Sequence, residues 1–427
     1  MKEKRLVVSL PAQDVGLLTQ NRDGMIRWAP DTGWERLGQK PRLGLDFLRV
    51  LGPRSHASEL PCWFENLLPE RESLLRARLS GAYGLREGQS FELLRVLGRD
   101  LPGAVEVRAG GDLVEDRAKP LVASDNGQDE ELESSSPGAS VRFSALAGMQ
   151  LKFSMSMVNQ RLAISARSRD SLWIVKLAGM DWDELAEVET ATMTWAKRAG
   201  FEVPEHFTVP FEKLDGIPGG WAEGTTPAFA IRRFDRRPDG SKVHQEDLCQ
   251  ALGLRPRDKY GDQFPSVTFE GALRLVDDAC GERDGREMAR RIGFMIASGN
   301  TDAHLKNWAL LWGDRERPTL APCYDLVATV AWDKLGWRRP LGPEFALRLG
   351  GEKLFRRFDD LALAAAQKSA RRAWVQEEVI VGVERARDAW PSVAEEAPRR
   401  MRTALEEHWT AVPLLARIGL PSRRIGP

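Results

Sequence analysis

The segment that most constrains the fold of this chain is residues 291–330, where a short polar cluster lies between two apolar segments. Residues 292–297 are apolar and predict a buried helix, which breaks at Ser298-Gly299-Asn300. Residues 308–312 are again apolar and predict a strand. A polar turn between two buried elements is therefore the first place to look for chemistry.

The polar turn carries Asp302 and Asn307 in a D-x-x-x-x-N spacing, and Asp325 follows. This spacing is typical of a phosphotransferase catalytic loop, in which the Asp accepts the substrate hydroxyl proton and the Asn holds Mg²⁺. Asp325 is placed to be a second metal ligand, because Mg²⁺ prefers hard oxygen donors beside nucleotide phosphates. Asp and Asn are also common turn residues, so the spacing by itself leaves a purely structural turn as an alternative.

Length and composition limit the other possibilities. A chain of 427 residues exceeds one typical core, so we expect two or three packed units. The 62 basic and 62 acidic residues cancel, which argues against direct nucleic-acid binding. The four cysteines are scattered without a C-x-x-C pair, and no signal peptide or bilayer-length apolar run occurs. We therefore predict a cytoplasmic protein without a membrane partner, a zinc site or disulfides.

The chain is expected to have four parts and an α+β fold. Residues 121–140 are acidic and Ser-rich at their centre, with too little apolar surface to bury, and predict a flexible linker. Before this linker, residues 1–120 form an N-terminal unit. After it, residues 141–240 form a β-rich lobe and residues 241–427 a helical C-terminal lobe that contains the polar turn.

Lys176 lies in an apolar strand predicted over residues 171–177. An unpaired ammonium there would be costly, so we expect Lys176 to contact phosphates or a carboxylate; an edge-strand lysine that reaches solvent is the alternative. Glu189 lies early in the helix predicted over residues 183–199, and a helix Glu paired with a strand Lys positions phosphates in protein kinases. At Ala147-Gly148 the backbone could approach a ligand.

Several motifs, in the same order along the chain, resemble the HipA family of bacterial toxin kinases. They cover most of the chain and lie at residues 64–69, 98–105, 147–152, 174–177, 233–237, 245–250, 301–307 and 324–326. The resemblance implies a protein-kinase-like two-lobe fold with an N-terminal subdomain, a nucleotide-binding β-rich lobe and an all-helical C-terminal lobe. It also implies a serine/threonine protein kinase that uses ATP and Mg²⁺.

The same resemblance assigns roles to individual residues. It makes Asp302 the catalytic base and makes Asn307 and Asp325 the metal ligands. Arg232 departs from the family pattern, in which a Glu precedes Arg-Phe, although backbone hydrogen bonds to adenine do not depend on that side chain. The residues expected to contact the nucleotide are Ala147, Gly148, Met149, Gln150, Leu151, Lys152, Lys176, Arg232, Arg233, Phe234, His304, Lys306 and Tyr324.

Family members typically pair with a small helix-turn-helix antitoxin that binds operator DNA. We therefore expect a HipB-like antitoxin as partner, with DNA contacted only through it. Known family targets include aminoacyl-tRNA synthetases, which implies a translation-related protein substrate, growth arrest and persistence. Members also silence themselves by autophosphorylation of a serine before the phosphate loop. Here the nearest serine, Ser144, lies one residue farther away, and is either that site or a serine that hydrogen-bonds the loop backbone.

Two other functions remain open. A small-molecule phosphotransferase of the aminoglycoside-kinase type shares the D-x-x-x-x-N spacing, but the motifs at residues 64–69 and 98–105 speak against it. A non-catalytic co-repressor partner of a DNA-binding antitoxin would not need Lys176, Asp302 and Asn307, which are intact. These motifs do not name the substrate, because substrate choice lies in surface shape.

Overall fold

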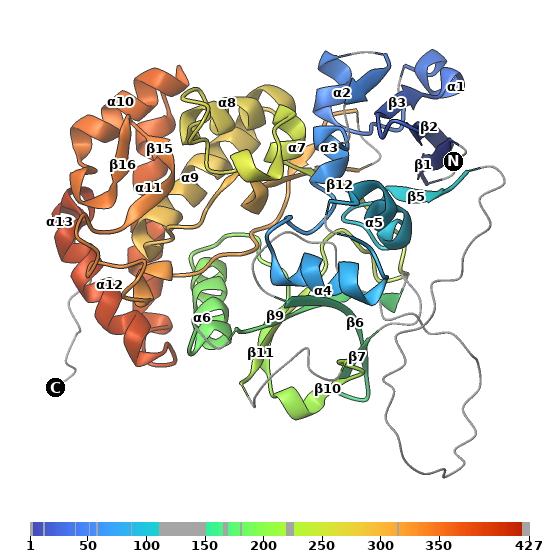
Figure 1. Ribbon diagram of the computed structural model, residues 1–427. Helices are drawn as coiled ribbons and strands as arrows, with labels where there is room; N and C mark the ends of the chain where they lie inside the picture. Colours follow the sequence, from blue (N-terminus) through green and yellow to red (C-terminus); the bar gives the residue numbers. More distant parts are fainter. Residues whose placement is uncertain are drawn as a thin grey trace, which may run out of the picture. The chain divides into compact units, whose positions relative to one another are not determined.

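The computed structural model describes residues 3–420 except 12, 39, 51, 57–58, 87, 111–150, 165–169, 180–181, 219–225 and 314–315. The chain divides into two compact units, each of which combines segments that are distant in sequence (Figure 1). The first unit comprises Met1–Met180, Val209–Glu246 and Gln250–Pro256. The second comprises Asp181–Thr208, Asp247–Cys249 and Arg257–Pro427.

An antiparallel five-stranded sheet, in the order β4-β3-β2-β1-β5, forms the N-terminal part of the first unit. Its strands are β1 (Lys4–Leu10), β2 (Gln13–Gln20), β3 (Ile26–Pro30), β4 (Arg54–His56) and β5 (Glu106–Ala109). Alternation along β1 places Leu6, Val8 and Leu10 in the core. The β2–β3 hairpin turns at Asn21, whose side-chain oxygen accepts backbone N–H groups two and four residues later.

Five short helices accompany this sheet: α1 (Thr32–Arg36), α2 (Leu45–Arg49), α3 (Cys62–Glu65), α4 (Leu74–Ala82) and α5 (Ser90–Leu97). Trp28 of β3 and Phe64 of α3 pack with ring centroids 5.1 Å apart. Beside them, the buried Glu65 Oε1 accepts hydrogen bonds from Arg76 and Ser90. Glu65, which belongs to the motif at residues 64–69, therefore links α3 to α4 and α5.

The remainder of the first unit is a mixed sheet with β6 at its centre. The strands of this sheet that lie wholly in the first unit are β6 (Leu151–Val158), β7 (Arg161–Ile164), β8 (Trp173–Leu177), β10 (Leu214–Asp215) and β11 (Ala228–Arg232). Strand β6 pairs antiparallel with β7 and β8, and β8 pairs antiparallel with β11. Strand β10 joins β7 in parallel. Strands β6, β8 and β11 are buried over most of their length, which is typical of strands covered on both faces.

Helices dominate the second unit, as the C-terminal sequence predicts. They are α6 (Leu185–Arg198), α8 (Phe269–Cys280), α9 (Glu282–Ser298), α10 (Asp360–Ala370), α11 (Val375–Ala389), α12 (Arg399–Ala411) and α13 (Pro413–Ile418). Two short hairpins join them, β13 (Ala309–Trp312) with β14 (Thr319–Leu320) and β15 (Glu344–Leu349) with β16 (Glu352–Leu354). Strands β9 (His206–Val209) and β12 (His244–Asp247) and helix α7 (Leu248–Leu252) occur where the chain passes from one unit to the other.

Helix α9 is the buried centre of the second unit. Its C-terminal half, predicted to be a buried helix, is indeed shielded from solvent. It packs against α11 through two glycines, because a Cβ on Gly293 would lie 2.1 Å from the Val379 carbonyl oxygen and one on Gly382 would lie 1.9 Å from that of Arg290. The two backbones approach too closely for any side chain at these positions. Helix α9 is therefore a firm support for the polar turn that follows it.

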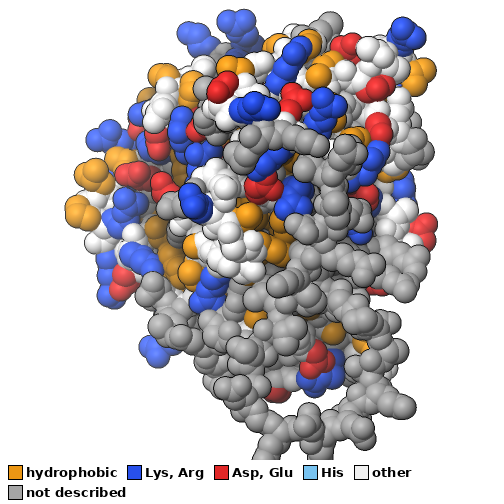
Figure 2. Space-filling view, turned by 45° about the vertical axis from the view of Figure 1, so that its right-hand side comes forward, with side chains coloured by type: hydrophobic (Ala, Val, Ile, Leu, Met, Phe, Trp, Pro, Cys, Tyr) orange, Lys and Arg blue, Asp and Glu red, His pale blue; other side chains and the backbone are white. Residues whose placement is uncertain are grey.

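On the face shown in Figure 2, Lys and Arg side chains lie among Asp and Glu side chains. This mixture agrees with the zero net charge of the whole sequence. In the part of the chain that the structure describes, no helix combines the length and the apolar character needed to cross a bilayer.

All five histidines have a pKa below the ordinary value, and burial is the largest cause for each. The pKa of His244 and that of His408 fall to about 4. His408 is buried in α12, and its neutral ring donates from Nε2 to the Ile296 carbonyl at 2.8 Å. The unfolded chain gains these protons near pH 6.5, whereas the folded chain does not. The stability that the neutral forms of His244 and His408 contribute is therefore complete above pH 6.5 and is lost as the pH falls toward 4.

We expect His244 and His408 each to lower the free energy of unfolding by about 2 kcal/mol between pH 7 and pH 5. His408→Gln keeps a side-chain donor for the Ile296 carbonyl but cannot take up a proton. Its unfolding free energy should therefore fall less over the same range. Urea unfolding of both proteins at the two pH values measures the difference, and equal falls would contradict the assignment.

Candidate active site

The predicted catalytic turn lies between the C-terminus of α9 and β13. Helix α9 ends at Ser298, and Gly299 follows in the left-handed conformation with φ 61°. A Cβ on Gly299 would also lie 2.5 Å from Val330 Cγ2, so both the cap and the packing require glycine. Thr301 then links the turn to a later segment, because its backbone N–H donates to Thr329 Oγ1 at 2.6 Å.

Three hydrogen bonds hold the backbone of Asp302. Its N–H donates to Asn300 Oδ1 at 2.9 Å. Its carbonyl accepts from the His304 N–H at 2.7 Å and from Asn307 Nδ2 at 2.8 Å. The 3₁₀ turn η4 (Leu305–Asn307) returns the chain so that Asn307 reaches this carbonyl. The structure thus brings Asp302 and Asn307 into direct contact.

Sequence reasoning missed Tyr260, which touches the predicted base. Its hydroxyl donates to Asp302 Oδ1 at 2.6 Å, across 42 residues of sequence. Its ring lies edge-on to that of His304, with centroids 5.2 Å apart. Such a separation leaves no local spacing signal, so no pattern in the sequence could have identified this contact.

Asp325 stands in a strained backbone conformation beside the turn. Its φ is 53°, in the left-handed region that few residues other than glycine adopt, although Asp and Asn tolerate it best. On its N-terminal side, the Cys323 N–H donates to the Glu202 carbonyl at 2.8 Å. The Tyr324 hydroxyl donates to the Lys306 carbonyl at 2.9 Å. A strained residue held by its neighbours is a candidate for function.

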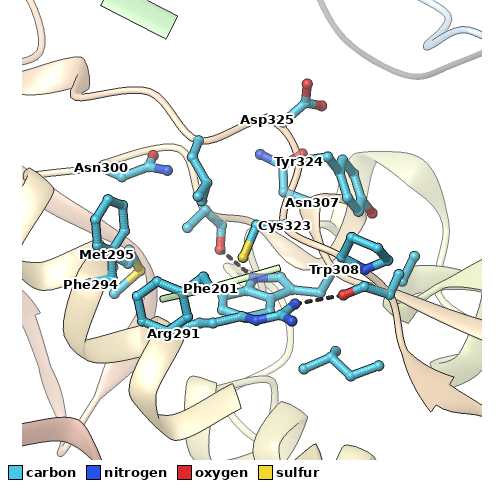
Figure 3. A pocket seen from close by; sticks show the side chains of 16 residues that line it. Phe201, Arg291, Phe294, Met295, Asn300, Asn307, Trp308, Cys323, Tyr324 and Asp325 are labelled. Carbon is cyan, nitrogen blue, oxygen red and sulfur yellow. Dashed lines mark hydrogen bonds between the residues drawn. The ribbon is translucent and has the colours of Figure 1, made fainter. Parts of the chain in front are cut away.

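A pocket adjoins Asn307 and Asp325 and is lined mainly by apolar side chains, among them Phe201, Phe294 and Trp308 (Figure 3). On one side of it, Arg291 donates to the Ala321 carbonyl at 2.6 Å. The two predicted metal ligands therefore lie at the wall of a pocket that is mainly apolar.

The three other predicted nucleotide contacts of this unit lie on the turn or against it. Lys306 is buried, with Nζ 2.6 Å from Asp247 Oδ2. Burial, together with Lys259 and Lys306, lowers the pKa of His304 well below its ordinary value, so the imidazole is neutral near pH 7. Burial, with the Asp247 carboxylate next, raises the pKa of Tyr324 well above its ordinary value. His304 and Lys306 are thus buried, and the half-buried Tyr324 contacts Lys306 through its hydroxyl.

The donor atoms at this site suit Mg²⁺. Asn307 offers an amide oxygen and Asp325 a carboxylate, and both are the hard oxygen ligands that Mg²⁺ prefers. Because Asn307 Nδ2 is held by the Asp302 carbonyl, its Oδ1 points away from that carbonyl. Among the described residues, no three or more His, Cys, Asp or Glu side chains gather as a metal site. Mg²⁺ beside a nucleotide usually completes its shell with phosphates and water.

In the first unit, two predicted phosphate contacts stand side by side. Lys152 of β6 and Lys176 of β8 are directly opposite in the antiparallel pair, and both are buried. Directly opposite residues share one face of a sheet, and like charges there repel one another. Lys176 Nζ also lies 5.2 Å from the centroid of the Phe229 ring. Two buried ammonium groups on one sheet face require negative charge nearby, from a carboxylate or a phosphate.

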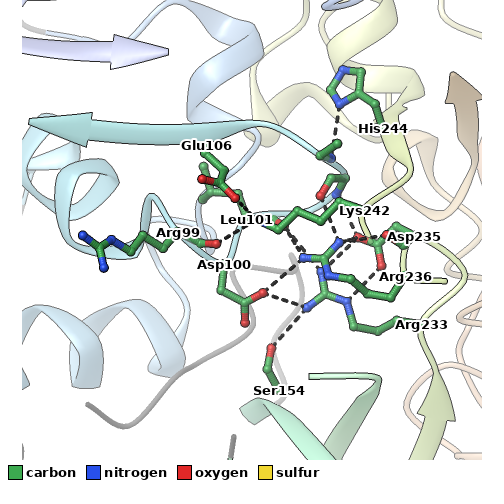
Figure 4. Close-up of polar contacts among 12 residues, drawn as sticks. Arg99, Asp100, Leu101, Glu106, Ser154, Arg233, Asp235, Arg236, Lys242 and His244 are labelled. Carbon is green, nitrogen blue, oxygen red and sulfur yellow. Dashed lines mark hydrogen bonds and ion pairs between the residues drawn. The ribbon is translucent and has the colours of Figure 1, made fainter. Parts of the chain in front are cut away.

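Arg233 and Arg236, just beyond β11, lie in a buried cluster of charges with Asp100 and Asp235 (Figure 4). Arg233 donates to both Asp235 oxygens at 2.9 Å and to Asp100 Oδ1 at 3.1 Å. Arg236 donates to Asp235 at 2.9 Å and to Asp100 at 3.2 Å. Burial would raise the pKa of Asp235, but the two arginines hold it well below its ordinary value. The Arg233 side chain thus joins β11 to the N-terminal part. Its backbone N–H donates to the Leu172 carbonyl at 2.8 Å, so the predicted contact with adenine would use its carbonyl.

Several predicted site residues are not brought together by these contacts. Arg232 and Phe234 are half-buried on either side of Arg233. Glu189 is buried in α6 of the second unit, and its pairing with Lys176 stays a prediction. Ser144, the phosphate-loop residues 147–150 and the linker at 121–140 lie outside the described residues. Leu151 and Lys152, at the end of that loop, begin β6.

Two family descriptions match the chain. "HipA N-terminal domain" matches residues 6–108, and "HipA-like C-terminal domain" matches residues 144–399. The chain belongs to the HipA family. The family predicted from the sequence motifs is therefore confirmed, and the predicted catalytic turn lies within the matched C-terminal region.

Curated relatives of this HipA family member carry kinase names. "Putative kinase Y4dM" of Sinorhizobium fredii is 36% identical over 77% of this chain and 78% of its own length. "Putative kinase Y4mE" of the same species is 28% identical over 79% and 78%. "Serine/threonine-protein kinase toxin HipA" of Shewanella oneidensis is 29% identical over 64% of each chain.

The fold is similar to that of a solved HipA structure, the Shewanella oneidensis MR-1 complex of HipA, HipB and its operator DNA. The match has a TM-score of 0.68 and covers 96% of both chains at 22% identity. At this identity the likeness concerns the fold. The predicted α+β, HipA-like fold is confirmed.

The buried charge cluster should control stability. Asp235→Asn removes the carboxylate shared by Arg233 and Arg236, and we expect it to lower the free energy of unfolding by about 3–5 kcal/mol. Asp239→Asn, in an exposed turn nearby, should have a much smaller effect. Urea unfolding measures both, and equal effects would contradict the role of the cluster.

Asp325→Asn should abolish the part of the ATP-induced thermal shift that depends on Mg²⁺, because it removes the charge of a predicted metal ligand. Asn is the replacement of choice, since it tolerates φ 53° where Ala would be strained. The exposed Asp333→Asn serves as control. A Mg²⁺-dependent shift equal to that of the parent protein would make Asp325 a structural residue.

Proposed function

We propose that this HipA family protein is an ATP-dependent serine/threonine protein kinase that acts as a HipA-type toxin. The observation that carries the proposal is the turn after α9, where Asp302 and Asn307 are in contact and Asp325 stands beside them in a strained conformation. The kinase names of the curated relatives support the same reaction class.

In this mechanism Asp302 accepts the proton of a substrate serine or threonine hydroxyl. The hydroxyl oxygen forms a bond to the γ-phosphorus of ATP, the bond from that phosphorus to the bridging oxygen breaks, and ADP leaves. The three backbone hydrogen bonds of Asp302 fix where this residue stands before substrate arrives. A base that already lies at the site lowers the entropic part of the barrier.

Asn307 and Asp325 would hold Mg²⁺, which would neutralise charge on the phosphates when bound. Lys152 and Lys176, which are buried directly opposite one another on β6 and β8, would bind phosphate oxygens. His304, neutral near pH 7, would act as a hydrogen-bonding group rather than as a cation.

A HipB-like helix-turn-helix antitoxin is the proposed partner, and DNA is reached through it. Two observations support this: the fold match to HipA in a HipA–HipB–operator complex, and a net charge of zero in this chain. The proposed substrate is a translation-related protein such as an aminoacyl-tRNA synthetase, whose phosphorylation arrests growth. Ser144 is the proposed site of autophosphorylation, where a phosphate would repel bound nucleotide.

Asp302→Asn should abolish phosphoryl transfer and leave ATP binding largely unchanged, because it removes the base and no proposed phosphate contact. Calorimetry measures ATP binding. Incubation with labelled ATP and a bacterial lysate measures transfer and identifies the labelled substrate. Asp262→Asn, on an exposed carboxylate, is the control. Full transfer by Asp302→Asn would remove the assigned role, and label that appears only on small molecules would replace the protein kinase with a small-molecule phosphotransferase.

A further inference from the structure

The described contacts of Asp302 separate into two groups. The hydrogen bonds from Asn300, His304 and Asn307 involve the Asp302 backbone, so they fix where the residue stands. The rotation of its carboxylate about χ1 and χ2 is a separate freedom, because a fixed backbone still permits several rotamers. The hydrogen bond from the Tyr260 hydroxyl, 2.6 Å from Oδ1, restricts this rotation of the carboxylate. It is a short hydrogen bond to a charged acceptor, the strong class of hydrogen bond.

Tyr260 is itself held against the catalytic turn by its neighbours. The carbonyl of Lys259 accepts from the Leu305 N–H at 3.2 Å, which joins the two segments through their backbones. Lys259 Nζ lies 5.1 Å from the centroid of the Tyr260 ring, and the ring also packs nearly perpendicular to that of His304. The position of the hydroxyl is therefore supported by contacts of the ring as well as by the backbone.

The loop that carries Tyr260 is closed on its C-terminal side. The Gly261 N–H donates to the Asp258 carbonyl at 2.9 Å. Gly261 has φ 71°, and a Cβ there would lie 2.7 Å from the Val267 carbonyl oxygen. This position requires glycine in both conformation and space. The tyrosine therefore stands on a tight turn, so its hydroxyl contributes a directed hydrogen bond at a small entropic cost.

We propose that Tyr260 is a positioning residue for phosphoryl transfer, which orients the Asp302 carboxylate through its hydroxyl. This inference rests on the proposed kinase function. Tyr260 acts through Asp302 and has no assigned contact with nucleotide, so its hydroxyl should affect the transfer step rather than nucleotide binding.

The kinetic test is Tyr260→Phe, which keeps the ring and its contacts with Lys259 and His304 and removes only the hydroxyl. We expect kcat at pH 7.5 to fall by about tenfold, while KM for ATP changes less than about twofold. Tyr83→Phe, which removes a tyrosine hydroxyl in the first unit, should leave both values unchanged. A kcat equal to that of the parent protein, or a loss that appears only in KM, would overturn the proposal.

A second measurement tests the contact without requiring activity. The chain has three tyrosines, so labelling with ¹³Cζ-tyrosine gives three NMR signals, and Tyr260→Phe identifies one of them. Asp302→Asn should shift the Tyr260 signal, because a neutral amide replaces the charged acceptor. Tyr324→Phe removes a hydroxyl that donates to the Lys306 carbonyl instead, and should leave the Tyr260 signal in place.

The two measurements separate the possible failures. If Asp302→Asn leaves the Tyr260 signal unchanged, the contact does not exist and the positioning role is overturned, whatever the activity. If the signal shifts but the parent protein transfers no phosphate, the proposed kinase function fails while the contact stands as a structural one. A shifted signal together with reduced kcat supports both.

Discussion

The rest of the site depends on the hydrogen bonds that close the turn around Asp302. A charged side chain beside an apolar pocket is stable only when the polar backbone atoms around it are satisfied. Here the Asn300 side chain accepts a hydrogen bond from the Asp302 N–H, and the Asn307 side chain donates one to the Asp302 carbonyl. The polar residues of the turn therefore fix its backbone, and they are also the residues predicted to carry out the chemistry. Helix α9 supports this turn, because the close backbone contact of its Gly293 with α11 fixes the helix from which the turn begins.

A second constraint operates in the first unit, where four charges are buried together. Asp100 comes from the N-terminal part, whereas Asp235 and the two arginines follow β11. Removing charges from water is costly, so such a cluster is stable only when every member has oppositely charged partners. The motif at residues 233–237 therefore has a structural role that its resemblance to a nucleotide-binding segment did not indicate. It makes the N-terminal part a support for β11.

Much of the fold could be predicted from local pattern. The apolar runs at residues 292–297 and 308–312 correctly indicated a buried helix, α9, and a strand, β13. The break at residues 298–300 was also correct, because a left-handed glycine cap is recognisable from sequence. The paired placement of Lys152 and Lys176 was not predictable, since strand register depends on how distant segments pack.

The sequence by itself determined the family, the α+β class and the set of polar residues in the predicted catalytic turn, because caps, spacings and periodicities act over a few residues. Tertiary structure alone decided that the hydroxyl of Tyr260 meets Asp302 across 42 residues and that Arg233 pairs with Asp100 across 133. Both contacts join segments whose separation in space depends on the packing of whole elements. A hydrogen bond or a buried ion pair forms only when that packing brings its atoms within about 3 Å, and no local rule encodes this distance.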